Sequence, residues 1–155
     1  MHIGRRTLIT GLVAGIAAIA VGGASLADAG STAAGGRFVL IETTTDRATV
    51  DVDRSGTSTP GDEFIFHSVL TNAAGTQVGS VNGHCTVLPG ARNLCHSVVA
   101  LARGTLSTTF VAAAGSAQLA ISIDGGTGRL GRSRGQITAT RASQTAVREV
   151  FDIDR

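Results

Sequence analysis

Two histidine–cysteine pairs are the residues of this sequence best suited to metal chemistry, since imidazole and thiolate both bind zinc. His84 precedes Cys85, and Cys95 precedes His96. Both pairs fall in stretches that we predict to be β-strands, where successive side chains point to opposite faces. Each histidine therefore faces away from its cysteine, and the four side chains do not converge on one ion. We predict no metal here.

The two cysteines are better explained as a pair. Cys85 and Cys95 flank a turn built on Pro89 and Gly90, which places them opposite each other on one face of a hairpin. Antiparallel partners at that separation meet disulfide geometry in an oxidising compartment. We therefore predict a Cys85–Cys95 disulfide, and the alternative is a free Cys85 thiol.

A glycine-rich stretch, Gly-Gly-Thr-Gly at residues 125–128, resembles a phosphate-binding loop. Such loops need a helix after the glycines, whereas here a strand-like run follows. The glycines therefore predict a tight strand-to-strand turn, with positive φ supplied at no steric cost. Arg132 and Arg134 lie on one face of the next run and could hold a carboxylate. Alternatively, they form a solvated outer face or inter-strand ion pairs.

Other catalytic and metal-binding patterns are weak. Asp46, Asp51, Asp53 and Asp62 are interpreted as loop or strand-end residues, without the glycine and ligand spacing of a calcium loop. No Ser/His/Asp arrangement stands out. We expect neither a hydrolase nor a metalloenzyme.

The elements that must position these residues are short strands. Runs rich in Val, Ile, Thr and Phe are separated by Gly, Asn, Asp or Pro. We place the runs at 37–44, 48–53, 63–71, 77–87, 94–102, 105–113, 118–123, 132–141 and 146–153. Eight or nine short strands indicate an antiparallel sandwich or a closed barrel.

The first 29 of the 155 residues read as an export signal. Arg5 and Arg6 precede an apolar run at 8–21, and small residues at 27–29 provide a cleavage site. The alternative is an uncleaved anchor, although the run is short for a bilayer. The paired arginines also fit a twin-arginine signal, so the route, Sec or Tat, stays open. We expect a secreted protein with no stable membrane span after processing, a flexible lead-in at 30–36 and one barrel domain at 37–155.

Charge excludes one class of partner. All 13 basic residues are arginines, and the formal charge is only +2, with neither Trp nor Tyr. Without a basic stripe or stacking aromatic residues, we predict no nucleic-acid binding. Arginine without lysine suggests a bacterial source of high GC content.

Alternation within one run defines two faces. At 63–71, Phe64 and Phe66 point one way and His67 points the other, which makes His67 external. Inward residues elsewhere are small, so a barrel would be either packed solid or partly hollow with an apolar lumen.

Three ordered motifs carry a resemblance to a known family. They are the Gly-Asp-Glu-Phe-Ile-Phe of residues 61–66, the glycines of 75–83 followed by His84 and Cys85, and the stretch from Ile121 to Gly135. Together they resemble the allene oxide cyclase and dirigent barrel superfamily over about residues 38–141. The resemblance implies an all-β, eight-stranded antiparallel barrel, lipocalin-like in form and commonly a homotrimer. It also implies an apolar small-molecule ligand in the lumen and no cofactor.

The resemblance also assigns residues. Glu42 matches an acidic residue on the first strand and is the candidate catalytic group, since an apolar-lined carboxylate has a raised pKa or stabilises a cation. Its alternative is an ordinary solvent-facing position. The expected lumen residues are Thr44, Phe64, Phe66, Cys85 and Arg134. Thr44 replaces the asparagine of the cyclases, whose Ser-Pro pair falls on residues 50 and 51, so jasmonate-type cyclisation is not implied.

The sequence thus predicts an exported barrel that binds a small apolar molecule and steers cyclisation or coupling of a reactive intermediate, acting as a cyclase, an isomerase or a dirigent-type protein. The alternative is a non-catalytic, filled barrel that supplies a trimer surface. A hollow lumen with Glu42 or Arg134 projecting into it favours the first.

Overall fold

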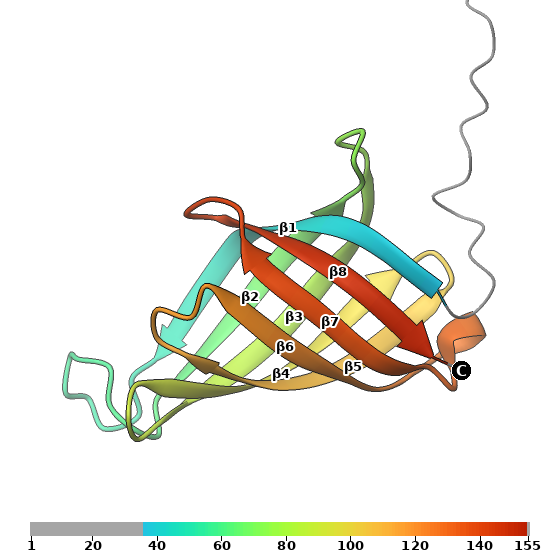
Figure 1. Ribbon diagram of the computed structural model, residues 1–155. Coiled ribbons are helices and arrows are strands. Elements are labelled where there is room, and N and C mark those ends of the chain that lie inside the picture. Colours follow the sequence, from blue (N-terminus) through green and yellow to red (C-terminus); the bar gives the residue numbers. More distant parts are fainter. Residues whose placement is uncertain (1–35, 155) are drawn as a thin grey trace, which may run out of the picture.

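The computed structural model describes residues 36–154, which form a closed β-barrel (Figure 1). Eight antiparallel strands follow one another around the barrel in chain order, and β1 pairs with β8 to close it. The strands are β1 (Gly36–Val50), β2 (Glu63–Thr71), β3 (Gln77–Leu88), β4 (Arg92–Leu101), β5 (Gly104–Ala113), β6 (Gln118–Gly126), β7 (Arg134–Arg141) and β8 (Ala146–Asp154). The predicted eight-stranded antiparallel barrel is confirmed.

Strand β1 joins two runs that the sequence predicted as separate strands. The polar residues between them form a β-bulge, where the register with β2 shifts between Thr44 and Asp46. The Thr45 hydroxyl donates to the backbone carbonyl of His67 at 3.3 Å, which ties the bulge to β2. A bulge adds one residue to its strand, so Arg47 is opposite Phe66 and shares its inward face.

One half of the barrel is packed solid. Leu70, Leu106 and Phe151 are fully buried there, and the rings of Phe38 and Phe151 stack with centroids 4.6 Å apart. Large apolar side chains fill a small barrel because its strands leave only enough room for them. This end, which also carries the C-terminal end of β8, is called the closed end below (Figure 1).

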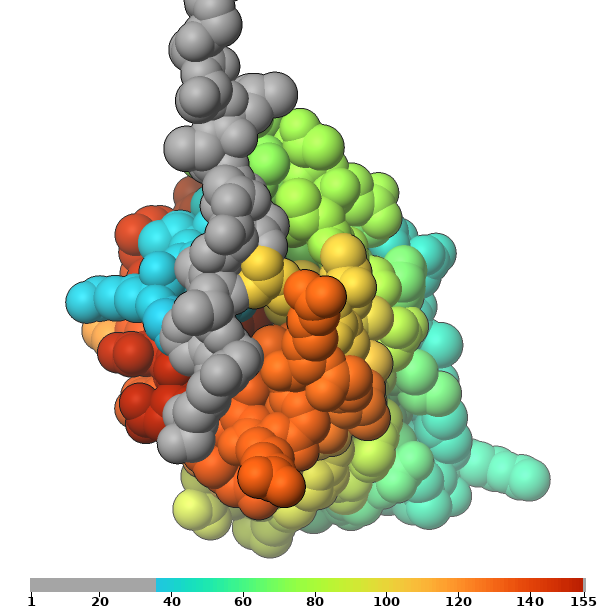
Figure 2. Space-filling model, turned by 90° about the vertical axis from the view of Figure 1, so that its right-hand side faces the viewer, coloured from blue at the N-terminus to red at the C-terminus, as the bar shows by residue number. Residues whose placement is uncertain are grey.

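The glycine-rich stretch covers the closed end, and the predicted tight turn is wrong. Gly125 and Gly126 end β6, and the connection to β7 contains a short 3-10 helix, η1 (Gly128–Leu130). Leu130 is buried against the core. The Thr127 N–H donates to the Thr105 carbonyl at 2.9 Å, so the segment is tied to the start of β5. Figure 2 views this end, and the orange segment spreads over it.

Close backbone approach requires glycine at Gly126, as it does at Gly128, where a Cβ would lie 2.6 Å from the Arg103 carbonyl oxygen. A Cβ at Gly126 would lie 2.4 Å from the Thr105 carbonyl oxygen and 2.5 Å from that of Leu130. A Cβ at Gly125 would meet only the Arg134 guanidinium, at an ordinary 3.5 Å. We therefore expect Gly126→Ala to lower the free energy of unfolding by about 1–3 kcal/mol, the usual cost of overpacking.

Thermal unfolding of the two variants checks this prediction. Gly125→Ala is the matched control, and its melting temperature should stay within a few degrees of the wild type. Equal losses in both variants would show that the close approach at Gly126 is not the cause.

The predicted disulfide is confirmed. Cys85 of β3 and Cys95 of β4 are directly opposite in the register, and their sulfur atoms are bonded. Both residues are buried on the inward face of the barrel wall, which leaves no free thiol among the described residues. The disulfide therefore locks the β3–β4 hairpin at the end opposite η1.

Loss of this bond should weaken the fold. The loop it closes spans 10 residues of sequence separation, and chain entropy assigns such a loop about 2–3 kcal/mol. We expect the double variant Cys85→Ala/Cys95→Ala to lose that much free energy of unfolding in urea. The wild type treated with reductant should unfold at the same urea concentration as the variant, and a higher midpoint would contradict a role for the bond.

The predicted export signal at 1–29 and the lead-in, except for Gly36, lie outside the described residues. Within residues 36–154 there is no helix long and apolar enough to cross a membrane.

Candidate functional site

The other half of the barrel is hollow. It encloses a cavity of about 170 Å³ that opens at the end opposite η1. Most of its wall is apolar, and the few polar groups are two carboxyls and two hydroxyls. The lining residues are Glu42, Phe66, Val81, Ser97, Val99, Thr108, Phe110, Leu119, Ile121, Ile137, Ala139, Val147 and Glu149. The barrel is therefore neither filled throughout nor open throughout.

Two carboxyl groups lie together in this cavity. Glu42 is opposite Val147 in the β1–β8 register, and Leu40 is opposite Glu149. Glu42 and Glu149 are thus diagonal neighbours on the inward face, a position from which long side chains make contact. Glu42 is half-buried, whereas Glu149 is only 3% exposed. Its Oε2 atom is buried with no hydrogen-bond partner.

Burial makes Glu149 a proton donor. It raises the pKa of Glu149 to about 9, and the charge of Glu42 and a hydrogen bond between the two side chains add to the shift. At neutral pH Glu149 is therefore protonated. Glu149 therefore offers an acid to a molecule in the lumen, and the neighbouring Glu42 is the candidate base.

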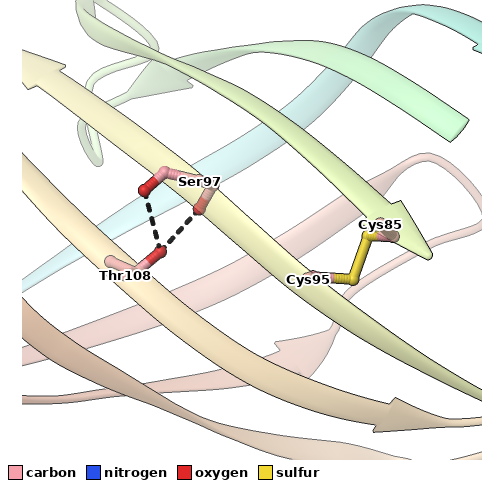
Figure 3. Close-up of a disulfide and its surroundings, with 4 residues drawn as sticks. All are labelled: Cys85, Cys95, Ser97 and Thr108. Atoms are coloured by element: carbon pink, nitrogen blue, oxygen red, sulfur yellow. Dashed lines mark hydrogen bonds between the residues drawn. A yellow bond between two sulfur atoms is a disulfide. The ribbon is translucent and has the colours of Figure 1, made fainter. Parts of the chain in front are cut away.

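Hydroxyl groups line the opposite wall, on β4 and β5 (Figure 3). Ser97 Oγ and Thr108 Oγ1 lie 2.6 Å apart, and the Thr108 hydroxyl donates to the Ser97 carbonyl at 3.3 Å. The Ser97 hydroxyl then donates to Thr108, which leaves lone pairs of Ser97 Oγ as acceptors. The cavity thus presents an acid on one side and acceptor oxygens on the other.

The residues expected in the lumen are divided between its interior and its edge. Glu42 and Phe66 line the cavity. Thr44 is exposed at the mouth, where its hydroxyl accepts from Ser68 at 3.3 Å. Phe64 is half-buried under the Arg47 guanidinium, and Cys85 lies in the wall as half of the disulfide.

Arg134 does not lie in the lumen, so that expectation is wrong. It begins β7 at the closed end, one residue before the inward-facing positions of that strand, and it is exposed. Its Nη1 donates to the adjacent Ser133 carbonyl at 2.9 Å. Arg132 lines a separate shallow hollow on η1 with Arg129. The two arginines therefore form no clamp inside the barrel.

Glu149 was missed by the sequence analysis. A signal was present, since Val147, Phe151 and Ile153 alternate with outward residues along 146–153 and Glu149 occupies the same inward series. A lone carboxylate in an apolar face is costly unless it is protonated or paired. Such a position marks a candidate site.

The histidines lie outside the barrel. The rings of His84 and His96 have centroids 5.5 Å apart, whereas Cys85 and Cys95 face inward. His67 is also on the outer side, with Nδ1 2.8 Å from Asn82 Oδ1. The histidines and cysteines therefore do not converge.

The acidic β1–β2 loop has the residue spacing of a calcium loop, so the prediction that it lacks this spacing is wrong. Asp51, Asp53 and Asp62 occupy positions 1, 3 and 12 of a segment whose sixth residue is Gly56, which is the spacing of a calcium loop. Their carboxylate oxygens lie within 4.8 Å of one another. We assign no ion, because these carboxylates already accept hydrogen bonds within the loop. The Asp62 carboxylate accepts hydrogen bonds from the backbone N–H groups of Thr59 at 2.8 Å and Val52 at 2.9 Å, and these bonds lower the pKa of Asp62.

Comparison with solved structures identifies the fold. The structure superposes on a pyocyanin demethylase with a TM-score of 0.66 at 24% identity, covering 77% of this chain and all of the other. It superposes on the pterocarpan synthase dirigent protein GePTS1 with a TM-score of 0.65 at 16% identity, covering 76% and 86%. The chain has the dirigent-type barrel fold. The fold resemblance predicted from the sequence is confirmed.

A third similar structure is the Diels–Alderase AbmU from Streptomyces koyangensis. The TM-score is 0.62 at 17% identity, and the alignment covers 77% of this chain but only 64% of AbmU. No protein-family model matches the sequence, and no curated protein does. At these identities the comparisons establish the shared fold.

The protonated Glu149 predicts how stability depends on pH. The folded-state pKa is raised from 4.5 to about 9, so between these values the unfolded chain ionises this residue and the folded chain does not. The folded state therefore loses stability as pH rises, by about 1.4 kcal/mol per unit. Glu149→Gln keeps the shape and removes the titration.

Urea unfolding between pH 5 and pH 8 measures this contribution as the difference between the wild type and Glu149→Gln. We expect the wild type to lose stability relative to the variant as pH rises. Parallel curves would mean that Glu149 ionises normally in the folded protein.

Proposed function

We propose that this protein binds a small apolar molecule in the open half of its lumen and moves a proton on it, with Glu149 as acid and Glu42 as base. The observation that carries the proposal is the buried Oε2 of Glu149, which lacks a partner and lies in the cavity wall. With its proton on Oε2, the Glu149 carboxyl donates a hydrogen bond to a carbonyl or ether oxygen of a ligand without further desolvation.

The chemistry follows from the pair. Glu149 donates its proton to a ligand oxygen as negative charge develops there, and Glu42 takes a proton from carbon or stabilises an adjacent positive charge. The apolar wall keeps the dielectric low, which strengthens both interactions. This combination suits enolisation, isomerisation or cyclisation of a reactive intermediate.

Cavity size limits the ligand. An apolar protein cavity of about 150 Å³ holds benzene, and this one measures about 170 Å³. We infer that one ring or a short chain enters the lumen and that any longer part extends through the mouth.

The comparisons support this reaction class. The similar structures are named as a demethylase, a Diels–Alderase and a dirigent protein. These names describe different reactions on small molecules in one kind of barrel. We therefore propose a cyclisation, isomerisation or stereocontrol activity and rank it above a purely structural barrel.

Proton transfer can be tested without the natural substrate. Cyclohexanone fits the cavity, and the protein should accelerate exchange of its α-protons in D₂O, which NMR follows directly. Glu149→Gln should lower the exchange rate about a hundredfold, the lower range for loss of a general acid. Glu42→Gln should also lower it. Glu63→Gln, which changes an exposed glutamate on β2, should leave it unchanged.

Ligand binding is measured separately. Ala139 lines the cavity, whereas Ala120 on β6 is exposed. Ala139→Leu should therefore weaken cyclohexanone binding, and Ala120→Leu should not. If all variants exchange α-protons at the wild-type rate, the acid–base role is refuted even where binding remains.

Export and assembly belong to the same proposal. The Cys85–Cys95 disulfide supports an oxidising compartment outside the cytoplasm, and the resemblance supports a homotrimer. Native mass spectrometry of protein recovered from the culture medium tests both, together with any retained ligand.

A further inference from the structure

A second hollow lies at the mouth of the lumen. It measures about 400 Å³ and is formed by the β1 bulge, the end of β7 and the β7–β8 loop. Val147 lines both this hollow and the cavity, so the two adjoin. The residues of the hollow are Thr44, Thr45, Asp46, Arg47, Arg141, Ser143, Gln144, Thr145 and Val147.

Two arginines from different strands face this hollow. Arg141 is opposite Val147 in the β7–β8 register and therefore shares its inward face. Arg47 is turned inward by the bulge, and its guanidinium carbon lies 4.0 Å from the centroid of the Phe64 ring. Among residues 36–154 no hydrogen bond or ion pair of the Arg141 guanidinium is found.

The charge of the hollow is positive. Asp46 is its one acidic residue, and this residue is opposite the outward-facing His67. Its carboxylate accepts from the Thr45 hydroxyl at 3.2 Å. Two guanidinium groups against one carboxylate attract an anion, and guanidinium geometry matches a carboxylate.

We propose that the mouth hollow binds the carboxylate of the same ligand whose apolar part fills the lumen, so that the substrates are small apolar acids. This inference rests on the proposed function and adds the substrate class to it. The carboxylate accepts from Arg47 and Arg141.

The spacing of residues along β8 sets a minimum length for the ligand. Val147 and Glu149 are two residues apart on β8, which corresponds to about 7 Å along a strand. A ligand that reaches from Glu149 into the hollow therefore spans at least about 7 Å. Glu42 is opposite Val147, so the ligand carboxylate lies on the outer side of Val147, against the two guanidinium groups.

Binding of 3-phenylpropanoate and 3-phenylpropanamide tests the inference. The two probes share a phenyl ring and a chain, and only the first is charged. At low salt the anion should bind about three- to tenfold more tightly by calorimetry, and the difference should shrink at 1 M salt, where charges are screened. Methyl NMR signals of Val81 and Val99 report whether the ring enters the lumen.

Single variants show which arginines cause the preference for the anionic probe. Arg141→Gln and Arg47→Gln should each reduce the preference for the anion and leave binding of the amide unchanged. Arg148→Gln removes the same charge from the exposed outer face of β8 and should keep the preference.

The outcomes separate the two proposals. If both probes enter the lumen with equal affinity, or if Arg148→Gln loses as much preference as Arg141→Gln, the carboxylate site is refuted and the lumen site stands. If neither probe shifts the lumen signals, the proposed function is refuted and this inference with it.

Discussion

Pairing of β1 with β8 is the interaction on which this molecule depends. It removes the last two sheet edges, whose unpaired N–H and C=O groups would otherwise invite aggregation. The same register sets Glu42 of β1 diagonal to Glu149 of β8. Closure of the barrel and assembly of the acid pair are therefore one event, and the site exists only when the first and last strands have met.

The two halves of the barrel have different tasks. Stacked phenylalanines and buried leucines fill the closed end. Their packing stabilises the fold and offsets the free-energy cost of burying Glu149. The Cys85–Cys95 disulfide cross-links β3 and β4 in the hollow half. The closed end and the disulfide therefore make the barrel stable enough to tolerate a buried acid.

Much of the fold was predictable, and less of the site. Alternation and turn residues located the strands, and the spacing of Cys85 and Cys95 around Pro89-Gly90 gave the disulfide. The Thr44–Asp46 bulge was read as a break because its polar residues look like a turn when the partner strand is unknown. Glu149 was overlooked for a related reason: its meaning depends on Glu42, more than 100 residues earlier in the chain, and only the barrel register joins them.

The β1 bulge has an electrostatic consequence. In a regular strand, inward positions would continue from Glu42 and Thr44 to Asp46, whose carboxylate would then border the lumen. The extra residue gives that position to Arg47 instead. One inserted residue thus inverts the charge that an approaching molecule meets at the entrance, and insertion or loss of a residue here offers a simple route by which such barrels change the charge of the molecules they admit.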